Sequence, residues 1–519
     1  MAMVVKNNMS AVNTLNTLNT NSTALSKSLA KVSSGMKING AADDASGYAI
    51  SERMRVQIRG LDQANANTQN GSSMMKTAEG AVSSTVDILK TLKEKVISAA
   101  NDDKTDADRQ AIQKELDQSI DQINDNANIT YNGKYLVDGS HNNAVKTATT
   151  TAFTNQSMSE SMKGNVNFTD ITDRNGNNIN IQKKDTVQIS FVKQGKTYTT
   201  SITAEGHNMR DLVKAANLEM FKQQVIAKGV DLSTGSGLSQ WTAFAKEGGT
   251  YDTQIKTLYN AEVEVDKANN LNLKNQKREA TNGLKDKLNF SQVEIGGEKF
   301  DFKSAIDLRM DSDTYIGKDK AGDSVYTADR SNGLSLHSAA SGISNQISGI
   351  TLSVSNTKGA VQKSVNAVLD NFSETIRAEN KSKDNAITLQ VGTKANQSIR
   401  VGLTDMRAEA LGLQSSNGAT LNVTTQKNAN AAINVLDNAL QKALDQQTTI
   451  GSIESRLEYT STNLTTSSQN VQASESTIRD ADMAKEMTNY TKNNVLLQAA
   501  QSMLAQANQS SSSVLSLLQ

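Results

Sequence analysis

The chain has 519 residues, and its 54 lysine and arginine residues balance 54 aspartate and glutamate residues, so the formal net charge at pH 7 is zero. This balance lacks the positive excess that nucleic acids and anionic membranes attract, and we expect neither as a partner. Cysteine is absent, which excludes disulfides and thiolate metal sites, and proline is absent too, which favours long uninterrupted helices.

The first third of the chain is predicted to be helical. Residues 1–35 show helical spacing of apolar residues diluted by Asn and Thr, which indicates a marginal helix, and a loop rich in Gly and Asx residues follows up to Gly47. A second helix is expected from about Ser46 to Ala100, because mostly apolar residues recur there at every seventh position. The members of this heptad are Met54, Leu61, Thr68, Met75, Val82, Leu89 and Val96. Such a repeat keeps one seam of a helix facing a partner helix.

A third helix is expected to begin near Thr105, where Thr105 and Asp108 fit a capping box. Its apolar face is formed by Ile112, Leu116, Ile120, Ile123 and Ala127. Asn132 and Gly133 then predict a turn.

The middle of the chain, residues 141–387, changes to a texture rich in Thr, Asn, Gly and Lys. Alternating runs at 187–192 and 196–202 predict two half-buried strands, and residues 209–228 and 359–379 carry helical spacing. We therefore expect a mixed α+β region of one or two solvent-facing domains.

No catalytic, cofactor or metal site is predicted. The three histidines, His141, His207 and His337, form no His-Glu-x-x-His motif, and no glycine-rich phosphate loop occurs. Residues 173–177 are similar to the start of a calcium loop. Because Ile171 occupies the first ligand position and Gln182 the twelfth, a hairpin turn is the better interpretation.

After the middle region, alternating residues at 386–391 and 398–403 flank a polar loop and predict a β-hairpin. A second long helix is expected from about Thr425 to Arg479, with its own heptad. Its members are Leu436, Ala443, Ile450, Leu457, Leu464, Val471 and Ile478. The two heptads predict an α+β fold in which a long antiparallel coiled-coil core is built from both chain termini and a β-rich outer domain is inserted between them.

The last 40 residues carry a diluted helical stripe. Its members are Met483, Met487, Tyr490, Leu497, Leu504, Leu515 and Leu518. Stripes as dilute as those at both ends of this chain do not hold a helix in isolation, so we expect each end to become ordered when a partner buries it.

Both ends of the chain resemble bacterial flagellins. At the N-terminal end the similar segments are 29–39, 42–47, 49–55, 58–61, 77–81 and 131–133, and at the C-terminal end they are 479–486, 504–509 and 514–518. The resemblance covers about residues 1–139 and 388–519. It departs at Ser510–Ser513, where flagellins usually have a proline, and at Met36-Lys37, where Leu-Arg is usual.

The resemblance implies a subunit that polymerises into the flagellar filament for swimming. It implies an inner coiled coil of residues 1–45 and 475–519, a helical-bundle rod with a hairpin formed by 46–140 and 388–474, and a variable outer domain at 141–387. A hook-filament junction-type protein, which would match the end motifs poorly, and a surface adhesin are the alternatives.

The resemblance also implies secretion of the unfolded chain through the flagellar type III apparatus, for which the absence of slowly isomerising proline is a second explanation. Other copies of the chain, a flagellar export chaperone, the filament cap and the hook-associated proteins are the implied partners. The C-terminal stripe is expected to serve in turn as chaperone ligand and inner-tube helix.

Charged residues near both ends are candidates for contacts between subunits, because paired charges fix register. They are Asp43, Asp44, Glu52, Arg53, Arg55, Arg59, Asp480 and Asp482. A solvated helix face is the alternative, and Asp480 and Asp482 are possible partners of the arginines.

A vertebrate Toll-like flagellin receptor is the last implied partner. Its candidate contacts are Lys90, Thr91, Leu92, Lys93, Glu94, Lys95, Ile97 and Glu115. Strongly stimulating flagellins have Arg at the position of Thr91 and Leu at that of Lys95. Loss of a guanidinium and of an apolar anchor predicts weakened binding or poor signalling.

Overall fold

A computed structural model describes residues 8–159, 162–230, 292–295, 298–301, 308–311, 315–326 and 334–518. For the described residues within 292–315, and for 511 and 514–518, it describes the backbone and not the side chains. The chain divides into two compact units. Unit 1 contains residues 1–74, 388–400 and 453–519, and unit 2 contains 75–387 and 401–452.

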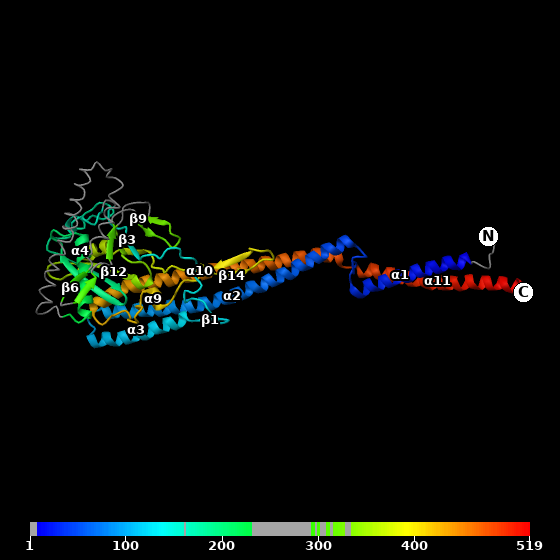
Figure 1. Cartoon of the computed structure of the whole chain (residues 1–519), viewed down its shortest axis with the longest axis horizontal. Coiled ribbons are helices and arrows are strands. Elements are labelled where there is room, and N and C mark those ends of the chain that lie inside the picture. The colour runs from blue at the N-terminus through cyan, green and yellow to red at the C-terminus, as the bar shows by residue number, and fades with distance from the viewer. Residues whose placement is uncertain are drawn as a thin grey trace, which may run out of the picture. The chain divides into compact units, whose positions relative to one another are not determined.

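In unit 1 the two ends of the chain form an antiparallel helix pair, in which α1 (Met9–Ser34) lies beside α11 (Met483–Leu518) (Figure 1). The Asn8 side chain caps α1 by accepting a hydrogen bond from the backbone N–H of Ala11 (3.0 Å), and its amide nitrogen donates to the carbonyl oxygen of Ala507 (3.2 Å). Farther along, the Asn493 amide donates to the Ser28 hydroxyl (3.2 Å). The helices predicted at both ends are confirmed.

The two seam helices are α2 (Ala45–Ala100) and α10 (Gln426–Arg479), and each contributes residues to both units. Within unit 1 they run antiparallel. The Ser468 hydroxyl donates to Asp62 (2.9 Å), and the Ser461 hydroxyl donates to Asn65 (2.7 Å). Leu61 packs there with Leu464 and Val471.

The heptad prediction is confirmed by burial. In unit 2 the α2 members Met75, Val82, Leu89 and Val96 are fully buried, as are Ala443 and Ile450 of α10. Each large side chain contributes about 1.5–3 kcal/mol relative to exposure. The one polar member in α2, Thr68, satisfies its buried hydroxyl by donating to the carbonyl oxygen of Ala64 (2.8 Å), which explains why the seam tolerates it.

Helix α3 (Asp106–Ala127) starts at the predicted capping box between Thr105 and Asp108. The Asp108 carboxylate accepts hydrogen bonds from the backbone N–H and from the hydroxyl of Thr105. These two bonds, and the backbone bond most of all, hold the pKa of Asp108 below its usual value. The buried Arg109 donates to the carbonyl oxygens of Ala99 and Asn101 (both 2.9 Å) and so caps the end of α2. The predicted turn at Asn132 and Gly133 is confirmed, with φ values of 51° and 75° between β1 (Thr130–Tyr131) and β2 (Lys134–Tyr135).

The inserted region of unit 2 contains two larger antiparallel sheets. One has the order β12-β4-β5, with β4 (Thr186–Lys193), β5 (Lys196–Thr203) and β12 (Ile347–Ser355). The other has the order β13-β3-β11-β8, with β3 (Ala152–Asn155), β8 (Leu308–Asp311), β11 (Leu334–Ser338) and β13 (Phe372–Ile376). The predicted strands at 187–192 and 196–202 are confirmed as β4 and β5, which pair in register from Thr186 with Thr203 to Lys193 with Lys196.

The remaining elements of the inserted region and its surroundings are mostly short. They are the 3₁₀ turns η1 (Phe168–Asp170) and η4 (Ile343–Asn345), the strand pairs β6 (Gln292–Ile295) with β7 (Glu298–Asp301) and β9 (Tyr315–Lys318) with β10 (Ser324–Tyr326), and the helices α4 (Met209–Ala227), α8 (Lys363–Leu369) and α9 (Ala408–Leu411). Helix α4 confirms the prediction at 209–228.

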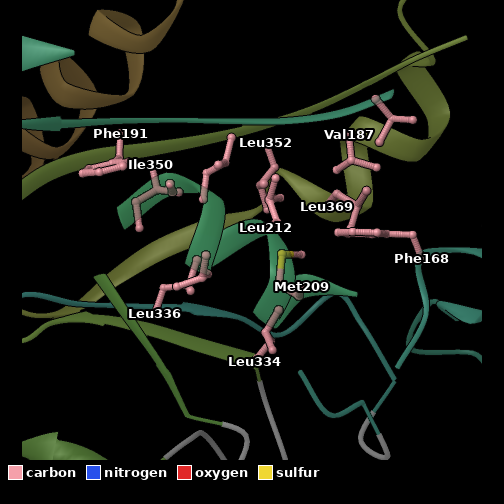
Figure 2. Packing of buried hydrophobic residues seen from close by; sticks show 14 of the residues in the cluster. Phe168, Val187, Phe191, Met209, Leu212, Leu334, Leu336, Ile350, Leu352 and Leu369 are labelled. Atoms are coloured by element: carbon pink, nitrogen blue, oxygen red, sulfur yellow. The ribbon is translucent and has the colours of Figure 1, made fainter. Parts of the chain in front are cut away.

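The two larger sheets share one hydrophobic core (Figure 2). Phe191 and Val187 of β4 meet Ile350 and Leu352 of β12 on one side, and α4 contributes Met209 and Leu212. From the second sheet come Leu334 and Leu336, while Phe168 and Leu369 close the cluster. These side chains make the α+β core of the inserted region.

One helix prediction in this region is wrong in extent. Of residues 359–379, only Lys363–Leu369 are helical, and Phe372–Ile376 form β13. The helix ends because Asp370 accepts the backbone N–H of Leu352 of β12 (2.7 Å), after which the chain pairs with β3. Burial raises the pKa of Asp370 to about 6.

The hairpin predicted at 386–403 is confirmed as β14 (Ile387–Gln390) and β15 (Ser398–Val401). In unit 1 it lies against α2, where Asn67 donates to the carbonyl oxygen of Gln390 (3.3 Å). Gly71 permits this approach, since a Cβ there would lie 2.7 Å from a methyl carbon of Leu389.

The hairpin-turn interpretation of residues 173–177 is also confirmed. One carboxylate oxygen of Asp173 accepts the backbone N–H groups of Asn175 (2.9 Å) and Asn177 (2.8 Å), and the bond from Asn177 is the main cause of a lowered Asp173 pKa. Within the described residues, no three His, Asp or Glu side chains gather as metal ligands. None of the described helices combines the length and hydrophobicity that crossing a bilayer requires.

Candidate assembly surface

The pair of terminal helices is held by a narrow seam in which larger apolar residues alternate with small and polar ones. In α1 the least exposed positions recur as a heptad, namely Ala11, Thr14, Leu18, Asn21, Leu25, Ser28 and Val32, and only Ser28 is buried outright. In α11 the matching positions are Glu486, Tyr490, Asn493, Leu497, Ala500, Leu504 and Ala507, and only Ala500 is buried outright. The pair therefore has almost no core of its own.

Large apolar side chains lie on the outer faces of this pair. In α1 they are Met9, Val12, Leu15 and Leu29, and in α11 they are Met483, Met487, Val495, Leu496 and Met503. Their exposed fractions run from 41% for Leu496 to 62% for Met9 and Met503. We call these nine residues the terminal apolar face. Exposed large apolar side chains in this number are typical of a surface that binds another chain.

The predicted C-terminal stripe is divided between these two surfaces. Tyr490, Leu497 and Leu504 are half-buried in the seam, whereas Met483 and Met487 are exposed. Leu515 and Leu518 have side chains that lie outside those described. Sequence reasoning missed Val495, Leu496 and Met503, which belong to the exposed face and not to the stripe.

Four acidic candidates for subunit contacts are engaged within their own chain. Asp43 accepts the backbone N–H of Asn39 (3.0 Å), and Asp44 accepts those of Ser46 and Gly47 at the start of α2. Asp480 accepts the Ser476 hydroxyl (2.6 Å), and Asp482 caps α11 by accepting the backbone N–H of Ala484 (3.0 Å). Within the described residues neither Asp480 nor Asp482 pairs with an arginine, so these acids act first as helix and loop caps.

The other four candidates for subunit contacts differ in their ion pairs and in their exposure to solvent. Glu52 accepts a hydrogen bond from Arg479 (2.6 Å), which is the main cause of its lowered pKa, and it also lies 3.4 Å from Arg55. Arg53 and Arg59 are exposed and have no ion-pair partner among the described residues. Arg479, which is only 6% exposed, was not among the predicted candidates.

The receptor candidates lie on α2 and α3 in unit 2. Leu92 is only 2% exposed and belongs to the core, so it is not available for a receptor. Lys93 forms an ion pair with Asp437, and Lys95 pairs with Glu115 (3.1 Å).

The other receptor candidates are accessible. Lys90 pairs with Asp87 (3.1 Å), Ile97 is 50% exposed, and Glu94 is exposed. Thr91 lies on an open groove between α2 and α3. The groove is lined by Gly80, Ser83, Ser84, Asp87, Ile88, Thr91 and Ser119.

Comparisons with known proteins match both ends of the chain. Residues 5–142 match the bacterial flagellin N-terminal helical region, and residues 433–518 match the bacterial flagellin C-terminal helical region. The chain is 29% identical to a flagellin of Clostridium tyrobutyricum, covering 98% of this chain and 99% of that one. It is 28% identical to flagellin A of Helicobacter pylori over the full length of both, and 25% identical to a flagellin of Bacillus subtilis over 99% of this chain and all of that one.

A solved structure of the flagellar hook associated protein-3 from Legionella pneumophila is 13% identical over 82% of this chain and 97% of its own. Its TM-score of 0.28 is too low to support a conclusion about fold or function.

Proposed function

The chain belongs to the bacterial flagellins and is a structural subunit of the flagellar filament, and we propose that burial of the terminal apolar face drives its polymerisation. It is a structural protein and not an enzyme, and it is part of the bacterial flagellum. Relatives named flagellin along the full chain favour this function over that of a junction-type protein or an adhesin.

The observation that supports the proposal is the exposure of nine large apolar side chains on α1 and α11. Full burial of one such side chain contributes about 1.5–3 kcal/mol, so even partial burial of several provides a large driving force. Contacts of this kind between unlike faces do not close on themselves, and they generate an open helical polymer.

The direct test is filament growth from the purified chain after addition of sheared filament seeds, followed by electron microscopy. We expect filaments whose mass increases with subunit concentration. A chain that stays monomeric at high concentration in the presence of seeds would overturn the proposal.

We further propose that three parts of the chain have different structural roles in the filament. Residues 1–45 and 475–519 would form the inner coiled coil, residues 46–140 and 388–474 the helical rod with its hairpin, and residues 141–387 the variable outer domain. The α1–α11 seam, the heptads of α2 and α10, and the separate core of the two sheets support this division.

Arg53 and Arg59 are the best remaining candidates for charged contacts between subunits, because both are exposed and unpaired among the described residues. We expect Arg53→Glu with Arg59→Glu to raise the critical concentration for polymerisation by about tenfold, since reversed charges oppose the correct register. The matched control is the pair Arg53→Lys with Arg59→Lys, which should polymerise almost normally. Unchanged filament yield in the charge-reversed variant would count against the assignment.

Export through the flagellar type III apparatus, a chaperone on α11, and contacts with the filament cap and hook-associated proteins remain proposals for this chain. The terminal apolar face fits the helix-in-groove mode of chaperone binding. One surface can serve a chaperone before export and neighbouring subunits afterwards.

Recognition by a vertebrate Toll-like receptor is proposed to use the accessible residues Lys90, Thr91, Glu94 and Ile97, together with the Lys95–Glu115 pair. We expect low potency, and we expect Thr91→Arg with Lys95→Leu to increase it by about tenfold through a guanidinium and an apolar anchor. The open groove beside Thr91 leaves room for the longer side chain. Receptor signalling in cultured cells measures this, with Lys134→Gln, at an exposed lysine outside the candidate contacts, as the control. Potency of the unaltered chain equal to that of a strongly stimulating flagellin would refute the prediction.

A further inference from the structure

We propose that Arg479 is a positioning residue for polymerisation, because it fastens the end of α1 and the start of α11 to the adjoining ends of α2 and α10. This inference depends on the proposed role of the terminal helices in assembly. We call Arg479 and its side-chain partners Met36, Tyr48, Ser51 and Glu52 the Arg479 latch. All five residues lie in unit 1.

Arg479 carries a buried charge. Arg479 ends α10 and is 6% exposed, a position that an arginine occupies only when its charge and its donors are satisfied. Its guanidinium donates to Glu52 (2.6 Å) and approaches the Ser51 hydroxyl (3.4 Å). The guanidinium carbon also lies 5.5 Å from the centre of the Tyr48 ring, within cation–π range.

The backbone around Arg479 also joins the two ends of the chain. The N–H of Lys37 donates to the carbonyl oxygen of Arg479 (2.6 Å), and the N–H of Ala481 donates to the carbonyl oxygen of Gly35 (2.9 Å). Met36 and Asp480 thus form a short antiparallel bridge. Gly35, with φ 70°, ends α1 in the left-handed conformation that directs the chain into this bridge.

These contacts join the two chain ends at one point. The Nε of Arg479 contacts the sulfur of Met36 (3.2 Å), so the same side chain touches the segment after α1 and the first turns of α2. Only a guanidinium can donate in several directions while its face lies over a ring, and lysine cannot reproduce this geometry. The latch is therefore a buried link between the terminal pair and the helices that follow it.

The test compares the critical concentration for polymerisation across four variants of the full chain and one control variant. We expect Arg479→Gln and Glu52→Gln each to raise it by about tenfold, and the double variant to be no worse than either one, because both remove the same interaction. Arg479→Lys, which keeps the charge, should fail to restore normal polymerisation. Arg456→Gln is the control, because Arg456 is an exposed arginine of the same helix in unit 1.

A second measurement separates positioning from general stability. Hydrogen exchange in the assembled filaments should show faster exchange of the Lys37 and Ala481 amides in Arg479→Lys, with unchanged protection in α3 and β4. Normal polymerisation of both Arg479 variants would overturn the latch and leave the filament function intact. Equal loss of protection throughout the chain in Arg479→Lys would also overturn it. Failure of the unaltered chain to polymerise would instead count against the proposed function.

Discussion

A chain that lacks residues 480–519 is expected to form no filaments, even when seeds are added. The deletion removes α11 and with it five members of the terminal apolar face, and it leaves α1 without the partner of its seam. At 1.5 Å per residue, the 36 residues of α11 span about 54 Å of helix that subunits could share. Sedimentation and electron microscopy after seeding measure the loss.

Unit 2 should remain folded in this truncated variant, because no residue of α11 belongs to it. Thermal unfolding of the core shared by the two sheets therefore serves as the control. The same deletion should abolish binding of a flagellar export chaperone in a titration with the purified components. A truncated chain that still binds the chaperone would refute the idea of one surface with two successive uses.

The long helices and their seam could be predicted from the sequence because their signals are local and repeated. Six heptad positions of α2, from Leu61 to Val96, and five of α10, from Leu436 to Leu464, are buried, so the repeat records which face meets the partner. The capping box at Thr105 and the Asn132-Gly133 turn are likewise decided within four residues. The resemblance of the chain ends to flagellins supplied the function, which periodicity alone does not.

The errors arose where distant contacts decide the structure. Helical spacing at 359–379 persists in the sequence, yet pairing with β3 and the bond from Leu352 to Asp370 convert its second half into a strand. Asp44 and Asp482 cap the starts of α2 and α11 within their own chain, and their contacts with neighbouring subunits stay a prediction.

The role of Arg479 also could not be predicted from the local sequence. It closes the second heptad region next to a recognisable motif, so its position was visible in the sequence. Its burial depends on Tyr48 and Glu52, more than 400 residues away, and no local pattern predicts that encounter. The exposed apolar residues Val495 and Leu496 were missed for a related reason, since they lie outside the regular stripe.

Lys442→Met is expected to destabilise unit 2 by about 3–5 kcal/mol, the usual cost of breaking a buried ion pair by removing one partner. Lys442 of α10 lies 3.3 Å from Glu374 of β13, and the two side chains are 8% and 6% exposed. Without the ammonium group, the Glu374 carboxylate stays buried beside Arg377 alone, at 3.8 Å. Urea unfolding followed by hydrogen exchange in β3 and β13 measures the change.

The double variant Lys442→Met with Glu374→Met separates the loss of the pair from the isolation of a charge. It should recover most of the stability, because two apolar side chains of similar size need no partner in the core, whereas a single charge does. Lys90→Met provides the matched surface control: its pair with Asp87 (3.1 Å) is exposed, and its loss should cost under about 1 kcal/mol. If Lys442→Met were no more destabilising than Lys90→Met, the buried pair would not be what fastens β13 to α10.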